Sequence, residues 1–251
     1  MNTTLTAAII TATLFTSVFL GIRLRRLLPE HHLSADTKDA VKLAMGLVAT
    51  MSALLLGLLV SSAKGTYDAQ RDQVIQMAAK IIFLDRVLAL YGPEAMEART
   101  PLRAAVEEAV RRVWPEEKGL RARLVPHLQA GDEVYNAIQG LPARDDTQRS
   151  LKVQALTLAM ELGQLRSLLL ARSVASISKP LLVVVVCWLV VIFFSFSLVA
   201  PPNATATLAL LVSALSVSGA IFLILELDRP FGGLIQISSE PILKVLSQLG
   251  K

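Results

Sequence analysis

The sequence LAMGLVATMSALLLGLLV, residues 43–60, decides the fold of this chain, and VSSAKGTYDAQRD continues from it over residues 60–72. Lys42 precedes the first stretch, and no charged residue interrupts it. A helix needs about 20 predominantly apolar residues to cross the hydrocarbon core of a membrane. The stretch therefore predicts a transmembrane helix. The change to polar sequence after Val60 predicts where the membrane-spanning part of that helix ends.

Small and hydroxyl-bearing residues recur through this span at intervals of three or four, so they share one face of a helix. The members of this small-residue stripe are Gly46, Ala49, Thr50, Ala53, Gly57 and Ser61. The opposite face carries the bulky residues Leu47, Leu54, Leu55, Leu58 and Leu59. A small-residue stripe either packs closely against other helices or lines a narrow path. The sequence leaves both interpretations open.

The composition places the chain between soluble and fully membrane-embedded proteins. Its 251 residues are 53% hydrophobic and 18% charged, and the mean hydropathy is +0.56. The apolar excess is concentrated in uncharged runs, which are Leu5–Ile22, Leu43–Val60, Leu181–Val199 and Ala204–Leu225. We therefore predict an all-α membrane protein with four transmembrane helices and a helical domain inserted between the second and third spans. The expected boundaries are 1–63 for the first two spans, 64–179 for the inserted domain, 180–226 for the last two spans and 227–251 for a tail.

Several other classes of function find no support in the sequence. Arginines follow the first uncharged run instead of preceding it, so we interpret it as a retained span and not as a signal peptide. The lone Cys187 allows no intrachain disulfide, and His31, His32 and His127 lack metal-ligand spacing. Basic and acidic residues are interleaved over 64–179, which is typical of a solvated surface and not of a nucleic-acid interface. We expect no enzyme, cofactor or metal, because no catalytic or phosphate-binding motif is present.

Two apolar stripes predict how the inserted domain packs. The first follows the second span in a heptad-like pattern and comprises Tyr67, Val74, Met77, Ile81, Leu84, Leu88 and Tyr91. The second comprises Leu151, Ala155, Leu158, Leu162, Leu165 and Leu169. Because one helix leaves the membrane and the other returns to it, we expect the two stripes to face each other in an antiparallel pair.

Turn residues predict where the shorter helices of the domain begin and end. Gly92-Pro93 should end the first long helix, and Thr100-Pro101 should start the next one. The stretch Glu116–Leu141 should form one or two short helices, with Pro126 and Gly131 as interruptions. The tail should contain an amphipathic helix over Pro241–Leu249.

An even number of spans places both termini and the inserted domain on the same side of the membrane. Near the membrane, this side carries Lys64, Arg71, Lys80, Arg166, Arg172, Lys179, Arg229 and Lys244. The opposite side carries fewer basic residues, namely Arg23, Arg25, Arg26, Lys38 and Lys42. The positive-inside rule therefore favours a cytoplasmic domain with cytoplasmic termini.

Charged residues follow the second and the fourth span at the same predicted membrane face. The members of this membrane-face charge cluster are Lys64, Asp68, Arg71, Glu226, Asp228 and Arg229. Charges at this depth are costly unless they are paired or hydrated. The cluster could concentrate ions at a channel mouth, or it could clamp the spans together. The clamp predicts a salt bridge from Asp228 or Glu226 to Lys64 or Arg71, in the same or a neighbouring subunit.

The stretches VSSAKGTYDAQRD (60–72) and ELDRPFGGLIQISSEP (226–241) resemble a bacterial membrane family termed bestrophin-like. The resemblance covers the layout of two spans, a helical insert, two spans and an amphipathic tail. It implies a homo-oligomer such as a pentamer in the bacterial inner membrane, with the second span of each subunit facing a central ion path. Membrane lipid and inorganic ions would then be its partners. The alternative is a non-conducting scaffold or sensor whose helical domain binds a protein partner.

Overall fold

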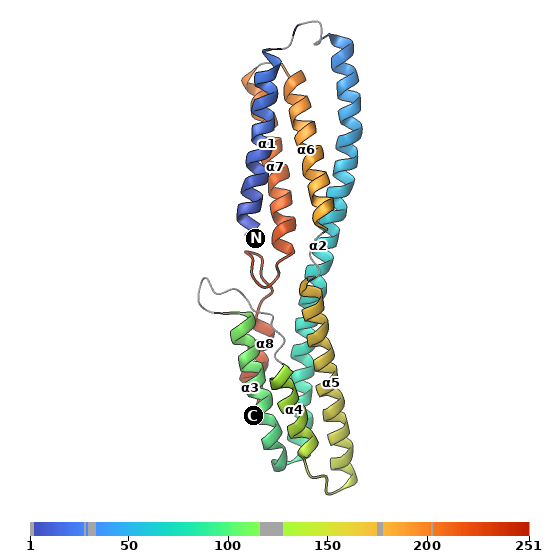
Figure 1. The fold of residues 1–251 in the computed structure, drawn as a ribbon. Coiled ribbons are helices and arrows are strands. Elements are labelled where there is room, and N and C mark those ends of the chain that lie inside the picture. The colour runs from blue at the N-terminus through green and yellow to red at the C-terminus, as the bar shows by residue number, and fades with distance from the viewer. Residues whose placement is uncertain are drawn as a thin grey trace. The chain divides into compact units, whose positions relative to one another are not determined.

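All regular secondary structure in the described residues is helical (Figure 1). A computed structural model describes residues 3–27, 29, 34–115, 128–174, 178–201 and 203–250. The helices are α1 (Thr3–Arg25), α2 (Ala35–Tyr91), the 3-10 helix η2 (Pro93–Ala95), α3 (Met96–Val113), α4 (Leu128–Gly140), α5 (Asp146–Val174), α6 (Lys179–Val199), α7 (Ala204–Leu227) and α8 (Glu240–Gln248).

The chain forms two compact units, and each is built from two separate segments. The first unit comprises Met1–Gly65 and Ser176–Arg229, and the second comprises Thr66–Ala175 and Pro230–Lys251. Helix α2 contributes its first part to the first unit and its remainder to the second.

Four helices among the described residues are long and apolar enough to cross a membrane, namely α1, α2, α6 and α7, and the first unit holds α1, α6, α7 and the first part of α2. They contain the four uncharged runs, so the predicted spans are confirmed in length and composition. Helix α1 packs against α6 and α7 (Figure 1). Their shared core includes Leu14, Leu59, Val185 and Ile221, one from each helix.

Helices α1 and α6 approach each other closely at Gly21. A Cβ atom added to Gly21 would clash with Ser197 Oγ and would lie 2.7 Å from the carbonyl oxygen of Phe194. Ser197 Oγ donates a hydrogen bond to that same carbonyl, at 2.8 Å. The absence of a side chain at position 21 is therefore a requirement of this helix crossing.

The second unit brings both predicted stripes into one core, except for Leu165, which is half-buried and not part of that core. Val74, Leu84 and Leu88 from α2 are buried there together with Ala155 and Leu158 from α5. Hydrogen bonds set the register of the two helices. Gln148 Nε2 donates to the Tyr91 carbonyl at 3.2 Å, and Lys80 Nζ donates to Glu161 Oε2 at 2.5 Å. The later residue of α2, Tyr91, thus contacts the earlier residue of α5, Gln148, and the earlier Lys80 contacts the later Glu161. The two helices are therefore antiparallel, as predicted.

The C-terminal segment packs into this same core. Helix α8 buries Ile242 and Val245 on one side, in agreement with the predicted amphipathic pattern. Trp114 Nε1 donates to the Ile237 carbonyl at 2.7 Å. The rings of Trp114 and Phe231 also pack edge to face, with centroids 5.8 Å apart and planes at 74°. The segment that looks like a tail in the sequence is thus part of the interior of the second unit.

The predicted start of α3 at Thr100-Pro101 is wrong, because the helix begins earlier, at Met96. Pro101 lies inside the helix, and the Thr100 hydroxyl donates to the Met96 carbonyl at 3.0 Å instead of capping an N-terminus. The extra turn buries Ala98 in the core and brings Arg99 into hydrogen-bond contact with Asp85. These two contacts offset the loss of the backbone hydrogen bond that Pro101 cannot donate within the helix. Gly131 likewise lies within α4 and does not interrupt it. Pro126 lies outside the described residues.

Candidate functional site

The first part of α2 has one face that packs inside the chain. Ser52, Leu59 and Ala63 are buried, and Leu55 and Leu56 pack partly against the same core. Successive residues of a helix are rotated by about 100°. These residues consequently lie on one face of α2, and the rest of the helix surface is not covered by this core.

The small-residue stripe occupies one of the open sides. Gly46, Thr50, Ala53, Gly57 and Ser61 are exposed within this chain, and Ala49 is half-buried. A Cβ atom added to Gly46 or Gly57 would meet no heavy atom within 4 Å. The Thr50 hydroxyl donates to the Gly46 carbonyl of its own helix, at 2.9 Å. Nothing in the described part of the chain therefore packs on the stripe at its two glycines.

The bulky leucines of α2 divide into two sets, which the sequence pattern does not separate. Leu55 and Leu59 pack inside the chain, whereas Leu47, Leu54 and Leu58 are exposed. Leu47 and Leu54 each expose 65% of their surface, and Leu58 exposes 58%. Helix α2 thus has three distinct faces: an internal one, an open small one and an open bulky one.

The membrane-face charge cluster is divided between the two units. Lys64, Glu226, Asp228 and Arg229 belong to the first unit, and Asp68 and Arg71 belong to the second. Lys64 and Arg71 are exposed, whereas Asp68, Asp228 and Arg229 are half-buried. The predicted salt bridge between these groups stays a prediction.

Glu226 is the buried member of the cluster, with 1% of its surface exposed. Its Oε1 atom accepts a hydrogen bond from Thr3 Oγ1 at 2.5 Å. The contact joins the start of α1 to the end of α7, and these two ends lie close together in Figure 1. A buried carboxyl group requires such partners because its desolvation is costly. The sequence offers no signal for this contact, since the two residues stand at opposite ends of the chain.

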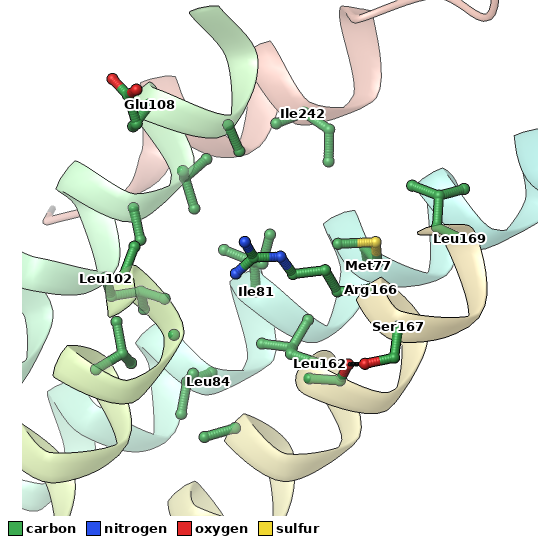
Figure 2. Close-up of a pocket in the computed structure, with 18 of the residues that line it drawn as sticks. Met77, Ile81, Leu84, Leu102, Glu108, Leu162, Arg166, Ser167, Leu169 and Ile242 are labelled. Carbon is green, nitrogen blue, oxygen red and sulfur yellow. Dashed lines mark hydrogen bonds between the residues drawn. The ribbon is translucent and has the colours of Figure 1, made fainter. Parts of the chain in front are cut away.

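The second unit contains an apolar pocket of about 470 Å³, which falls within the range of small-molecule sites. Its walls come from α2, α3, α4, α5 and α8, and Met77, Ile81 and Leu162 are among them (Figure 2). Arg166 extends from α5 into this apolar space (Figure 2). Its burial lowers the pKa of the Arg166 guanidinium, as does nearby Arg112, whereas Asp132 raises it. The sequence signal for this feature is an arginine placed between Leu165 and Leu169.

No group of three or more histidine, cysteine or acidic side chains in the described residues could hold a metal ion. His31, His32 and His127 lie outside the described residues. Cys187 is exposed on α6.

A comparison with protein families shows where this chain has a relative. A family model described as "Bestrophin-like domain" matches residues 11–242, which include most of the first span, the other three spans and most of the second unit. Comparison with curated proteins and with solved structures gives no significant match.

Proposed function

Because this chain belongs to the bestrophin-like family, we propose that it forms a homo-oligomeric ion channel in the bacterial inner membrane, with the first part of α2 lining the ion path. A pentamer is the assembly that the resemblance suggests. The inserted helical domain and both termini would lie in the cytoplasm, as the distribution of basic residues favours.

The observation that supports this proposal most directly is the open small-residue stripe on α2. A pore-lining helix must meet its own subunit on one side, symmetry-related copies and the path on another, and lipid or neighbouring spans on a third. The internal face of α2 with Leu59, the small face with Gly57 and the bulky face with Leu54 suit these three environments.

The chemistry of the small face suits ions that keep part of their hydration. Small side chains allow several copies of α2 to approach a common axis. The hydroxyls of Thr50 and Ser61 offer oxygen atoms to a partly dehydrated cation. The Thr50 hydroxyl uses its hydrogen within its own helix, so its lone pairs point outward as acceptors.

Flux measurements on purified protein in liposomes test the proposal with a matched pair of variants. Ala53→Trp adds bulk to the small face, whereas Leu54→Trp adds the same group to the bulky face one residue later. We expect Ala53→Trp to abolish or strongly reduce ion flux while the oligomer keeps its size. Leu54→Trp should retain most of the flux.

Two outcomes would contradict the channel. One is a well-assembled wild-type oligomer that gives no flux in several salts and at several pH values. The other is an equal effect of the two tryptophan variants, which would remove the small face from the ion path.

The alternative function is a non-conducting scaffold or sensor, and the apolar pocket of the second unit is the observation that favours it. In that case the small-residue stripe packs against other helices, and Gly57→Leu would break the oligomer apart. In the channel, the same substitution would change conductance and leave an oligomer of the same size. Size determination in detergent, combined with flux, separates the two functions.

A further inference from the structure

A second pocket lies at one end of the first unit, where α1 ends, α6 ends and α7 begins. Its volume is about 340 Å³. The described residues that line it are Ile22, Arg25, Arg26, Ser197, Ala200, Pro201, Asn203, Thr207 and Leu210. All of them belong to the first unit, and they stand at the end of the unit opposite to Thr3 and Glu226.

The charge of this pocket is positive. Arg25 and Arg26 are both part of its wall, and none of the described lining residues is acidic. Arg25 is half-buried, and its Nη1 atom is fully buried without a hydrogen-bond partner among the residues that the structure describes. An unpaired buried donor on a charged group is costly. The described part of the pocket wall therefore offers this donor no negatively charged acceptor.

The start of α7 adds to this positive field. Asn203 caps the helix, and its side-chain oxygen accepts from the Ala206 backbone amide at 2.7 Å. Asn203 is itself part of the pocket wall, and its side-chain amide nitrogen is a hydrogen-bond donor. The N-terminus of a helix carries a partial positive charge, and its free backbone amides attract oxyanions.

The remaining walls are apolar and come from the ends of membrane-spanning helices. Ile22, Ala200 and Leu210 line the pocket beside the arginines. A site with basic groups and apolar walls at the end of a span matches a molecule with an anionic head and an apolar body. Phospholipids place their phosphates at this depth of a bilayer.

We propose that this pocket binds the phosphate of an anionic phospholipid, with the Arg25 guanidinium as the principal donor and Arg26 and the start of α7 as supporting positive groups. The proposal is independent of ion conduction and applies equally to a channel and to a scaffold. It also gives the buried Nη1 atom of Arg25 an acceptor, which the described residues around it do not supply.

Arg23 provides a matched control. It lies in the last turn of α1, as Arg25 does, so both arginines interact favourably with the negative end of that helix. Arg23 is exposed and does not line the pocket. Replacing either residue removes the same charge from the helix end, but only Arg25→Gln removes a ligand of the phosphate.

The test is lipid binding to delipidated protein in a neutral detergent, measured by native mass spectrometry and by the midpoint of thermal unfolding. Phosphatidylglycerol should remain bound to the wild-type protein and raise its midpoint, and phosphatidylcholine should do so much less. Arg25→Gln should weaken phosphatidylglycerol binding about tenfold or more, as expected for the loss of one charge-assisted hydrogen bond. Arg23→Gln should bind as the wild-type protein does.

Equal binding by Arg25→Gln and wild type would overturn the proposal, as would equal losses in Arg25→Gln and Arg23→Gln. If inorganic phosphate alone raises the midpoint as much as phosphatidylglycerol does, the site binds a free anion and the lipid assignment is wrong. Should Arg25→Gln fail to fold, Arg25→Lys provides the same comparison, because it keeps the charge but loses the two-pronged donor geometry. It should fall between the wild-type protein and background binding, and wild-type affinity would contradict the role of the guanidinium.

Discussion

Asp85 on α2 and Arg99 on α3 form a two-pronged ion pair inside the second unit. Arg99 Nε lies 2.8 Å from Asp85 Oδ1, and Arg99 Nη2 lies 2.9 Å from Oδ2. Only 11% of the Arg99 side chain and 13% of the Asp85 side chain are exposed. The hydrogen bonds to Asp85 raise the pKa of the Arg99 guanidinium above its ordinary value. The pair therefore fixes the first turn of α3 to α2.

Removing one partner of this pair should destabilise the protein strongly. Asp85→Leu leaves the Arg99 charge nearly buried without its carboxylate, a change that costs about 3 kcal/mol. The midpoint of thermal unfolding in detergent should then fall by roughly 6–12 °C. Arg86→Met, at an exposed position on the same turn, should leave the midpoint unchanged. The double variant Asp85→Leu/Arg99→Met should recover part of the loss, and strictly additive losses would show that the two side chains act independently.

The antiparallel core of the second unit predicts a contrast between two leucines on α2. Leu84 is completely buried, whereas Leu90 exposes 60% of its surface. Leu84→Ala should lower the free energy of unfolding by about 2–5 kcal/mol, because it removes buried apolar surface and leaves a cavity. Leu90→Ala should change it by less than about 0.5 kcal/mol. Denaturant unfolding followed by circular dichroism measures both, and a similar loss in the two variants would contradict the register of this core.

The close approach of α1 and α6 predicts that Gly21 tolerates no side chain. Gly21→Ala forces the new methyl group against Ser197 and the Phe194 carbonyl, and such overpacking costs about 1–3 kcal/mol. Gly219→Ala in α7 is the control, because a Cβ atom there meets no heavy atom within 4 Å and alanine favours a helix. Thermal unfolding in detergent should show a lower midpoint for Gly21→Ala and an equal or higher one for Gly219→Ala. A wild-type midpoint in Gly21→Ala would mean that the two helices lie further apart.

The clamp interpretation of the membrane-face charge cluster predicts coupling between Lys64 and Asp228, which both belong to the first unit. Lys64→Glu and Asp228→Lys should each lower the unfolding midpoint, since each places like charges close together. The exchanged pair Lys64→Glu/Asp228→Lys should recover part of that loss, by about 0.5–3 kcal/mol of coupling energy. Purely additive losses in this cycle would leave the clamp without support from this pair.

The sequence by itself determined the features that depend on solvation and on near neighbours. A run of uncharged residues is stable in hydrocarbon only as a helix, so the four spans follow from composition alone. Gly92 adopts a φ of 124°, a conformation that favours glycine, and Pro93 follows it. The end of α2 at Tyr91 is therefore also determined by neighbouring residues in the sequence. The stripe of leucines from 151 to 169 predicted its partner stripe because a heptad pattern implies a matching apolar face.

Only the tertiary structure decided the features that depend on distant partners. Helix α3 begins at Met96 and not at Thr100-Pro101, because the packing of Ala98 and the ion pair of Arg99 outweigh the local preference of Thr100-Pro101 for a helix start. Glu226 meets Thr3, and Trp114 meets Ile237, across separations that no local pattern encodes. The same holds for α2, whose leucines look equivalent in sequence until packing turns Leu59 inward and leaves Leu54 exposed. The periodicity of a sequence indicates which residues share a face of a helix. Which of these faces becomes buried depends on the other helices that pack against it, and those come from distant parts of the chain.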